Sequence, residues 1–364
     1  MTIPIGLTHR AKTPPSTRLE FYDTIVVGGG QAGLAAGHHL AQKDIDFLIL
    51  DGNDRIGDSW RNRWDSLQLF TPARYSGLPG LPFPGRPLDL PNKNQVGDYL
   101  ERYAEHFDLP VRSGTRVTHL AMDGDRFVLH TAGVTYQANS VIVATGPFQK
   151  PRVPAIASQL PRAVQQFHSS DYQNPLHLPP GDVLVVGVGN SGAQIAMELA
   201  KSRQVWLAGR ESGHLRRRLL GRDLYDWIWP IFTRFDADTM IGRRMKRRTR
   251  ATDPLIGIAP SDIVRSGVTR VGRLTEVRDG QPFCEDRAID PAVVIWCTGF
   301  TADYGWIDLP VFGDDGYPRH DRGVVAEAPG LYFLGLRFLH RRTSALIGGV
   351  GADAAYVAEV ILKS

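Results

Sequence analysis

Two glycine-rich segments of the chain have the spacing that holds the phosphates of a dinucleotide. The first, Gly28-Gly-Gly30-Gln-Ala-Gly33, follows a short apolar stretch predicted to be a buried strand over residues 22–28. Gly28 would permit a tight turn, Gly30 would let a pyrophosphate approach the backbone, and Gly33 would let helix and strand pack closely. A helix over residues 34–43 would present its N-terminal amides and positive dipole end to those phosphates.

An acidic residue stands where such a site holds a ribose. Residues 46–50 are predicted to form a second strand, and Asp51 follows it directly. Its carboxylate is placed to accept hydrogen bonds from ribose hydroxyls. The complete succession of strand, glycine turn, helix, strand and acid is far more specific than the glycine pattern alone. The first unit is therefore expected to bind an adenosine with a free ribose.

The same pattern returns in the middle of the chain. Gly187-Val-Gly189-Asn-Ser-Gly192 follows a predicted strand over residues 182–186. A helix is expected over residues 193–202, and a further strand over 204–207. The repeat predicts a second dinucleotide site of the same design.

The two copies differ in the residue at the ribose position. Asp51 lies 18 residues after Gly33, and the residue 18 positions after Gly192 is Arg210. An arginine suits the 2′-phosphate of NADPH, whereas an acid holds a free hydroxyl. Glu211, next to Arg210, leaves the use of NADH open.

A second pair of similar segments marks the strands that close each unit. Residues 141–147 read Val-Ile-Val-Ala-Thr-Gly-Pro, and residues 293–299 read Val-Val-Ile-Trp-Cys-Thr-Gly. Each segment is predicted to cross between domains. The expected fold is α/β, with two Rossmann-like domains. The first consists of residues 21–149 and 290–364, and the second, residues 150–289, is inserted into it.

Composition sets broad limits on the protein. The chain has 364 residues, enough for two domains, with 42% hydrophobic and 22% charged residues, as in globular proteins. Its two cysteines form no disulfide scaffold and suit a reducing cytoplasm, where we expect the protein. Residues 1–20 are expected to be a flexible extension rather than a signal peptide. The absence of a long apolar run predicts no membrane span.

Residues 210–250 are unusually basic. They hold 12 Lys and Arg against 5 Asp and Glu, a net charge of +7, so the rest of the chain sums to −3 within the total of +4. Three interpretations compete: a solvated helical insertion that packs Trp227 and Trp229, an electrostatic funnel for NADPH, and a surface for nucleic acid or anionic membrane. No recognition motif accompanies the charge, so neither nucleic acid nor membrane is expected as a partner.

With two such units, the chain resembles the two-dinucleotide-binding-domain flavoproteins. Within them it is similar to the flavin-containing monooxygenase-like group, the class B flavoprotein monooxygenases. The resemblance covers nearly all of residues 22–362 and implies FAD in the first domain and NADPH in the second. It rests on residues 57–61 (Gly-Asp-Ser-Trp-Arg), Asn190-Ser191, His168 with Tyr172, and residues 297–300 (Cys-Thr-Gly-Phe).

The glycine pattern and the resemblance together give a set of cofactor-binding residues. Those expected near FAD are Gly28, Gly30, Gln31, Ala32, Gly33, Asp51, Gly52, Gly57, Asp58, Ser59, Trp60, Val117, Ala144, Thr145 and Gly146. Those expected near NADPH are Gly187, Gly189, Asn190, Ser191, Gly192 and Arg210. Thr298, Gly299 and Ile347 complete the set. The candidates for the immediate surroundings of the flavin are Trp60, Phe70 and Thr71, and no metal site is expected.

The sequence departs from the group at two places. The identifying motif F-x-G-x-x-x-H-x-x-x-F/Y keeps only His168 and Tyr172, because Arg162 and Val164 replace its Phe and Gly. Phe70 stands where many members have an asparagine that helps to hold the oxygenated flavin. The second departure bears on whether oxygen reaches a substrate.

The function implied by the resemblance is that of an FAD-dependent NAD(P)H monooxygenase. NADPH would reduce the flavin, O2 would add at C4a, and the (hydro)peroxyflavin would pass one oxygen atom to a small sulfide or amine, or to a ketone. The protein would supply position and exclude water, so no acid–base pair is required. The partners are then a small-molecule substrate and O2, and a homodimer is left open.

Three alternatives remain at this stage. An NAD(P)H oxidase or flavin reductase would release hydrogen peroxide. A dithiol reductase of similar fold would need a redox cysteine pair, normally C-x-x-C, whereas Cys284 and Cys297 are 13 residues apart. A nucleotide-sensing or scaffold protein would keep the fold without turnover.

Overall fold

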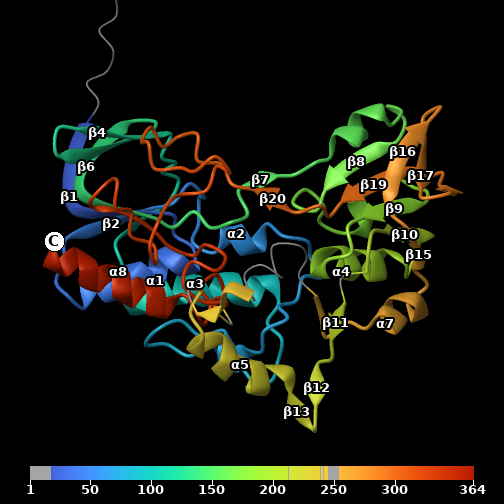
Figure 1. The fold of residues 1–364 in the computed structure, drawn as a ribbon, viewed down its shortest axis with the longest axis horizontal. Coiled ribbons are helices and arrows are strands. Elements are labelled where there is room, and N and C mark those ends of the chain that lie inside the picture. The colour runs from blue at the N-terminus through green and yellow to red at the C-terminus, as the bar shows by residue number, and fades with distance from the viewer. Residues whose placement is uncertain (1–17, 212, 238, 241, 245–253) are drawn as a thin grey trace, which may run out of the picture.

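The computed structural model describes residues 18–211, 213–237, 239–240, 242–244 and 254–364, which form two lobes (Figure 1). Each lobe contains one of the two predicted parallel strand–turn–helix units. The α/β architecture with two such units is therefore confirmed. None of the helices in the described ranges has the length and hydropathy that a membrane span requires.

The first lobe is built on a seven-stranded sheet in the order β3-β2-β1-β6-β5-β4, with β21 paired to the end of β6. Its strands are β1 (Arg18–Val27), β2 (Phe47–Leu50), β3 (Val111–Arg112), β4 (His119–Asp123), β5 (Arg126–His130), β6 (Val134–Val143) and β21 (Leu331–Phe333). Strands β3, β2, β1, β6 and β21 pair in parallel, and β4, β5 and β6 form an antiparallel meander.

Three helices cover one face of this sheet (Figure 1): α1 (Gln31–Ala41), α3 (Lys93–His106) and α8 (Gly351–Lys363). The alternation of buried side chains explains the layering. Val26 and Ile49 pack under the helices, whereas the neighbouring Ile25 and Leu50 face the opposite core with Leu331. Helix α3 begins at Lys93, where Asn92 and Gln95 form a reciprocal capping box.

The second lobe is built on a five-stranded sheet in the order β15-β10-β9-β19-β8, and all of its strand pairs are parallel. The strands are β8 (Gln165–His168), β9 (Val183–Val186), β10 (Val205–Ala208), β15 (Thr269–Val271) and β19 (Val293–Trp296). Helices α4 (Asn190–Leu199) and α7 (Pro260–Arg265) pack on one face. The other face carries a small sheet of β16 (Leu274–Arg278), β17 (Gln281–Cys284) and β18 (Arg287–Ala288).

Two predicted boundaries need correction. β19 pairs with β8 and β9, so residues 293–296 belong to the second sheet, although the sequence boundary at 290 placed them in the first domain. A short buried apolar strand looks the same whichever sheet it joins. The predicted N-terminal extension is too long, because residues 18–20 already belong to β1 and pair with residues 134–136 of β6. Residues 1–17 lie outside the described residues.

A two-stranded ribbon joins the lobes (Figure 1). Strand β7 (Lys150–Pro151) carries the chain into the second lobe, and β20 (Phe300–Thr301) brings it back alongside, antiparallel. The short helices that remain are α2 (Asp58–Arg61) and the 3-10 turns η1 (Ala73–Tyr75), η2 (Ala155–Gln159) and η3 (Pro175–His177).

A second connection is made by residues 210–257, which we call the arm. Its elements are β11 (His214–Leu215), β12 (Arg218–Leu219), β13 (Arg222–Asp223), α5 (Leu224–Arg234) and β14 (Leu255–Ile256). The arm leaves the second lobe after β10 and packs against the first, where Asp226 bonds to Tyr75 (2.7 Å) and Ala237 donates its N–H to the carbonyl of His340 (2.6 Å). The described part of the predicted basic segment thus bridges the lobes, and residues 212, 238, 241 and 245–250 of it lie outside the described residues.

Candidate functional site

The turn after β1 has the shape of a phosphate cradle. Gly28 adopts φ +111°, which favours glycine, and a Cβ there would lie 2.7 Å from the carbonyl oxygen of Ala144. A Cβ on Gly33 would lie 1.8 Å from the Gly28 oxygen, so α1 packs directly on the turn. At Gly30, by contrast, a Cβ would meet nothing within 4 Å. The N-terminus of α1 therefore opens on free space that a pyrophosphate fits.

The turn after β9 repeats this geometry. Gly187 adopts φ +117°, and a Cβ there would lie 2.3 Å from the carbonyl oxygen of Cys297. A Cβ on Gly192 would lie 1.9 Å from the Gly187 oxygen, while the space around Gly189 is open within 4 Å. Cys297 thus plays the packing role that Ala144 plays in the first lobe. The two lobes carry two anion cradles of one design.

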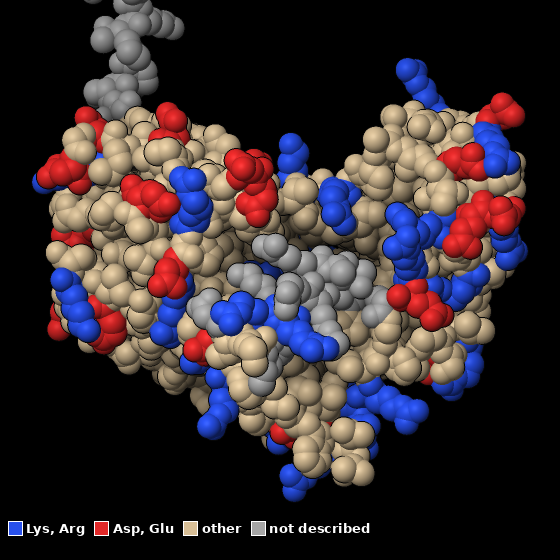
Figure 2. All heavy atoms as spheres, viewed as in Figure 1, with Lys and Arg blue, Asp and Glu red and all other residues tan. Residues whose placement is uncertain are grey.

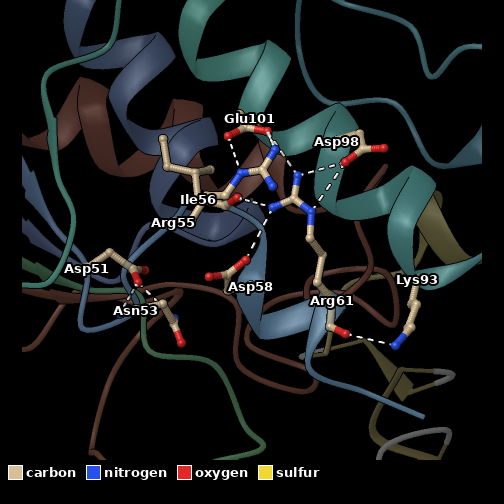
Figure 3. Close-up of polar contacts among 9 residues, drawn as sticks. All are labelled: Asp51, Asn53, Arg55, Ile56, Asp58, Arg61, Lys93, Asp98 and Glu101. Atoms are coloured by element: carbon tan, nitrogen blue, oxygen red, sulfur yellow. Dashed lines mark hydrogen bonds and ion pairs between the residues drawn. The ribbon is translucent and has the colours of Figure 1, made fainter. Parts of the chain in front are cut away.

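Asp51 lies beside the first cradle and is buried. Its Oδ2 accepts the backbone N–H of Gly29, and its Oδ1 accepts the backbone N–H (2.7 Å) and the side-chain amide (2.8 Å) of Asn53 (Figure 3). A carboxylate has about four lone-pair sites, so it retains capacity for a ribose hydroxyl. Thr115 donates its N–H to the Asp51 carbonyl (2.7 Å), which brings the segment containing Val117 alongside.

An arginine joins helix α2 to helix α3 by hydrogen bonds. Arg61 donates to the carbonyl of Ile56 (2.6 Å) and to the carboxylates of Asp98 (2.8 Å) and Glu101 (3.0 Å) (Figure 3). Gly57 begins the helix at φ +88°, where a Cβ would lie 2.4 Å from the carbonyl of Gly97. Sequence reasoning did not select Arg61; the crossing of two helices brings its partners together.

Trp60 is carried on the same helix and reaches back to α1. Its indole Nε1 donates to Oε1 of Gln31 across 3.3 Å. Gln31 is the first residue of α1, directly after the open position at Gly30. Two of the predicted cofactor-binding residues are therefore brought together at the mouth of the first cradle.

Phe70 and Thr71 lie where the arm meets the first lobe. The carbonyl of Phe70 accepts a hydrogen bond from Nη1 of Arg217 (2.5 Å), and Thr71 is buried. The segment that holds Ile347 lies against the loop after Thr71, because a Cβ on Gly348 would be 2.2 Å from the Tyr75 oxygen.

A cavity of about 470 Å³ opens next to this junction. Three aromatic rings contribute to its wall, Tyr75, Phe83 and Trp229, together with Arg74, Leu78 and Gly348. The rings of Tyr75 and Trp229 have their centroids 5.1 Å apart, so one side of the cavity comes from the arm and the other from the first lobe. The cavity is open to solvent, and its size suits a small molecule that meets both aromatic rings and polar groups.

Comparison with known proteins agrees with this geometry. Residues 25–247 match the pyridine nucleotide-disulphide oxidoreductase family, which is more than half of the chain. The chain belongs to this family. It is also 43% identical, over 94% of its length and 98% of the relative's, to an uncharacterized oxidoreductase, CzcO-like, of Geobacillus kaustophilus.

Two further relatives are monooxygenases. Indole-3-pyruvate monooxygenase YUCCA1 of rice (Oryza sativa subsp. japonica) is 27% identical over 93% of this chain and 90% of that protein. The structure of a flavin-containing monooxygenase from Stenotrophomonas maltophilia is 27% identical, with a TM-score of 0.77 over 94% of this chain and 99% of that one. This member of the pyridine nucleotide-disulphide oxidoreductase family is thus an oxidoreductase with the fold of flavin monooxygenases. One structure of this fold, OTEMO, is a complex with FAD and NADP.

In this oxidoreductase two arginines lie at the turn after β10, next to the second cradle. Arg210, the predicted residue, is exposed. Arg270 on β15 reaches the same turn, where its Nη2 donates to the carbonyl of Gly209 (3.2 Å), and burial lowers its pKa. The sequence did not point to Arg270, because only the pairing of β15 with β10 brings it there.

Two other predicted residues are engaged in holding the fold. The Asn190 side chain accepts the N–H of Ile256 (2.9 Å) and donates to the carbonyl of Pro254 (3.3 Å), which fastens the returning end of the arm. Thr298 donates its hydroxyl to the carbonyl of Arg152 at the ribbon. Their backbone groups remain beside the second cradle.

The cysteines lack the features of a redox pair. Both are free, and they lie on opposite faces of the second sheet, Cys284 with Trp296 and Cys297 with the α4 face. Burial raises the pKa of the Cys284 thiol to about 11 and that of the Cys297 thiol to about 12. Neither thiol is activated as a thiolate nucleophile near neutral pH.

Proposed function

We propose that this oxidoreductase is an NADPH-dependent flavoprotein monooxygenase. It places one oxygen atom from O2 on a small nucleophilic substrate, a sulfide, an amine or a ketone. The proposal rests above all on the repeated cradle, which provides places for two dinucleotides in one chain. The identity of 27% to two monooxygenases, over more than nine-tenths of this chain, supports the oxygenase reaction.

The first lobe fits FAD. The open space at Gly30, the backbone amides that follow it and the buried carboxylate of Asp51 would hold its pyrophosphate and ribose. When bound, the flavin supplies hydride acceptance, oxygen activation and oxygen transfer. We assign FAD to residues 21–149 together with the C-terminal segment, which begins after β19 rather than at residue 290.

The second lobe, from residue 150 to the return ribbon, fits NADPH. Gly189 leaves room for a pyrophosphate, and Arg210 and Arg270 flank the turn after β10 where a 2′-phosphate would lie. Each lobe would bind one nucleotide. The chain's own contribution is then to orient one nucleotide toward the other and to exclude water.

The aromatic cavity is our candidate for the substrate site. It adjoins the loop after Thr71, a candidate for the flavin's surroundings, and the segment of Ile347, a predicted cofactor-binding residue. Tyr75, Phe83 and Trp229 would hold an apolar substrate by their ring faces. No titrating group of the chain is needed for oxygen transfer itself.

The competing function is an oxidase that releases hydrogen peroxide. Phe70 favours it, because its side chain offers no hydrogen bond where many similar enzymes have asparagine. The ratio of substrate oxidised to NADPH consumed separates the two functions.

The test is a stoichiometry measurement on the FAD-loaded protein. Anaerobic NADPH should bleach the flavin absorbance, and re-aeration with methyl phenyl sulfide should give the sulfoxide in near-equal amount to the NADPH consumed. Peroxide without sulfoxide would assign the oxidase function. Failure of both NADPH and NADH to bleach a bound flavin would refute the oxidoreductase mechanism.

A further inference from the structure

The far end of the arm exposes a continuous apolar surface. The hairpin β12–β13 projects away from both sheets (Figure 1), and Leu219 and Leu220 at its tip are 48% and 84% exposed. Trp227 and Ile231, one turn apart on α5, are also exposed. Nε1 of Trp227 donates to the carbonyl of Leu219 (3.2 Å), so hairpin and helix form one surface. We call these four residues the apolar tip.

The turn of the hairpin holds a leucine in a backbone conformation that is unfavourable for this residue type. Leu220 adopts φ +51° and Gly221 adopts φ +77°, both in the left-handed region. Asparagine or glycine takes that conformation readily, whereas leucine is strained in it. An exposed leucine held in a strained turn is not explained by folding of the hairpin alone.

The arginines and the aspartates of the arm differ in their exposure to solvent. Seven arginines in the described part of the arm are exposed: Arg210, Arg216, Arg218, Arg222, Arg234, Arg243 and Arg244. Of these, Arg218 and Arg222 lie in the hairpin that carries the apolar tip. Three aspartates in the described part of the arm are instead paired: Asp223 bonds to Arg217 (2.8 Å), Asp226 to Arg74 and Tyr75, and Asp236 to Arg341 (3.5 Å). Glu211, at the base of the arm, is exposed. The lower end of the molecule accordingly shows tan and blue atoms with little red (Figure 2).

We infer that the apolar tip and its arginines dock on an anionic lipid bilayer. Leucine and tryptophan side chains enter the boundary between headgroups and acyl chains, while arginines bind lipid phosphates. A second copy of the chain is a poorer occupant, because a two-fold contact would set these arginines against each other. Nucleic acid is poorer too, because three of the four side chains of the apolar tip are aliphatic and give bases no stacking surface.

This placement reverses the sequence expectation that no membrane takes part. It also puts the aromatic cavity near the bilayer, since Trp229 in the cavity wall is two residues from Trp227 in the apolar tip. An apolar compound dissolved in the membrane would meet the cavity directly. The docking itself does not depend on the proposed reaction.

The test is co-sedimentation of the full-length, FAD-loaded protein with lipid vesicles. Vesicles of phosphatidylcholine with about 30% phosphatidylglycerol should bind the protein, and phosphatidylcholine alone should bind it at least about tenfold more weakly. Added salt should release it. Leu220→Glu should weaken binding about tenfold or more, and Arg218→Gln with Arg222→Gln in the hairpin should reduce it and its salt dependence.

Leu176→Glu is the matched control, because Leu176 is 92% exposed but lies outside the arm in η3; its binding should equal that of the wild type. All variants should keep flavin absorbance and melting temperature. Equal binding to neutral and anionic vesicles, or unchanged binding of Leu220→Glu, would overturn the proposal. So would a dimer in solution that Leu220→Glu dissociates, since it would assign the surface to a second copy.

Discussion

The imidazole Nε2 of His168 lies 3.0 Å from the carbonyl oxygen of Gly299, at the point where the chain turns back toward the first lobe. The backbone N–H of Ser170 donates to Nδ1 of the same ring (3.2 Å), so Nδ1 is the acceptor and Nε2 carries the proton. His168 ends β8, and Gly299 leads into β20 of the ribbon. A neutral histidine thus ties the second sheet to the connection between the lobes.

This buried hydrogen bond predicts that the stability of the folded protein depends on pH. Burial lowers the pKa of His168, so the unfolded chain binds the proton more readily than the folded one. Stability should therefore fall as the pH drops below the unfolded value of about 6.5. His168→Gln can still donate to Gly299 but does not titrate. Its melting temperature should drop less than that of the wild type between about pH 7.5 and pH 5.5.

His38, His39 and His340 also have pKa values lowered by burial, so the wild-type slope is shared among several groups. The comparison between His168→Gln and the wild type isolates one of them. Identical pH profiles for the two proteins would contradict the assignment of a buried neutral imidazole at the ribbon.

The first cradle predicts opposite outcomes for two glycine-to-alanine changes. Gly30→Ala places a methyl group in open space, so the fold should persist, while FAD retention falls about tenfold or more because the methyl group occupies the place of the pyrophosphate. Gly33→Ala would set a Cβ 1.8 Å from the Gly28 oxygen, so the protein should unfold or lose several degrees in melting temperature. Circular dichroism and flavin content distinguish the two. Full FAD retention by Gly30→Ala would show that the cradle does not bind the FAD pyrophosphate.

The local parts of this fold could be predicted from the sequence, because their rules act over short distances. The glycine turns, the strands before them and the helices after them follow from spacing, buried apolar runs and the need for close packing at Gly33 and Gly192. The same rules located Asp51. The repeat then gave the order of the two units along the chain.

The long-range contacts could not be predicted in this way. β19 has the same apolar pattern as the strand at 141–143, and only its pairing with β8 and β9 shows which sheet it joins. Arg270 meets the turn after β10 across 61 residues, and Asp226 reaches Tyr75 across 151. Charge count showed that the arm is basic, but not that Asp223, Asp226 and Asp236 are paired while most of its described arginines are exposed.

Arg61 should prove essential to the first lobe. Arg61→Ala removes bonds to Ile56, Asp98 and Glu101 from a side chain that is only 14% exposed, so we expect a loss of roughly 2–3 kcal/mol in the free energy of unfolding and weaker FAD binding. Arg55→Ala is the control: Arg55 also pairs with Glu101 but is 55% exposed, so its loss should cost under about 1 kcal/mol. Chemical denaturation measures both. Equal losses for the two variants would refute a special role for Arg61.

The pair Arg210 and Arg270 should set the preference between the two nicotinamide nucleotides. A hydrogen bond between charged groups contributes roughly 1.5–3 kcal/mol, so Arg270→Ala should lower kcat/KM for NADPH by about tenfold or more through KM. The value for NADH, which lacks the 2′-phosphate, should hardly change, and Arg210→Ala should act in the same direction. Arg265→Ala is the control, because Arg265 is exposed on α7 and pairs with Asp262 instead. Parallel losses with NADPH and NADH would show that Arg270 supports the sheet rather than the phosphate.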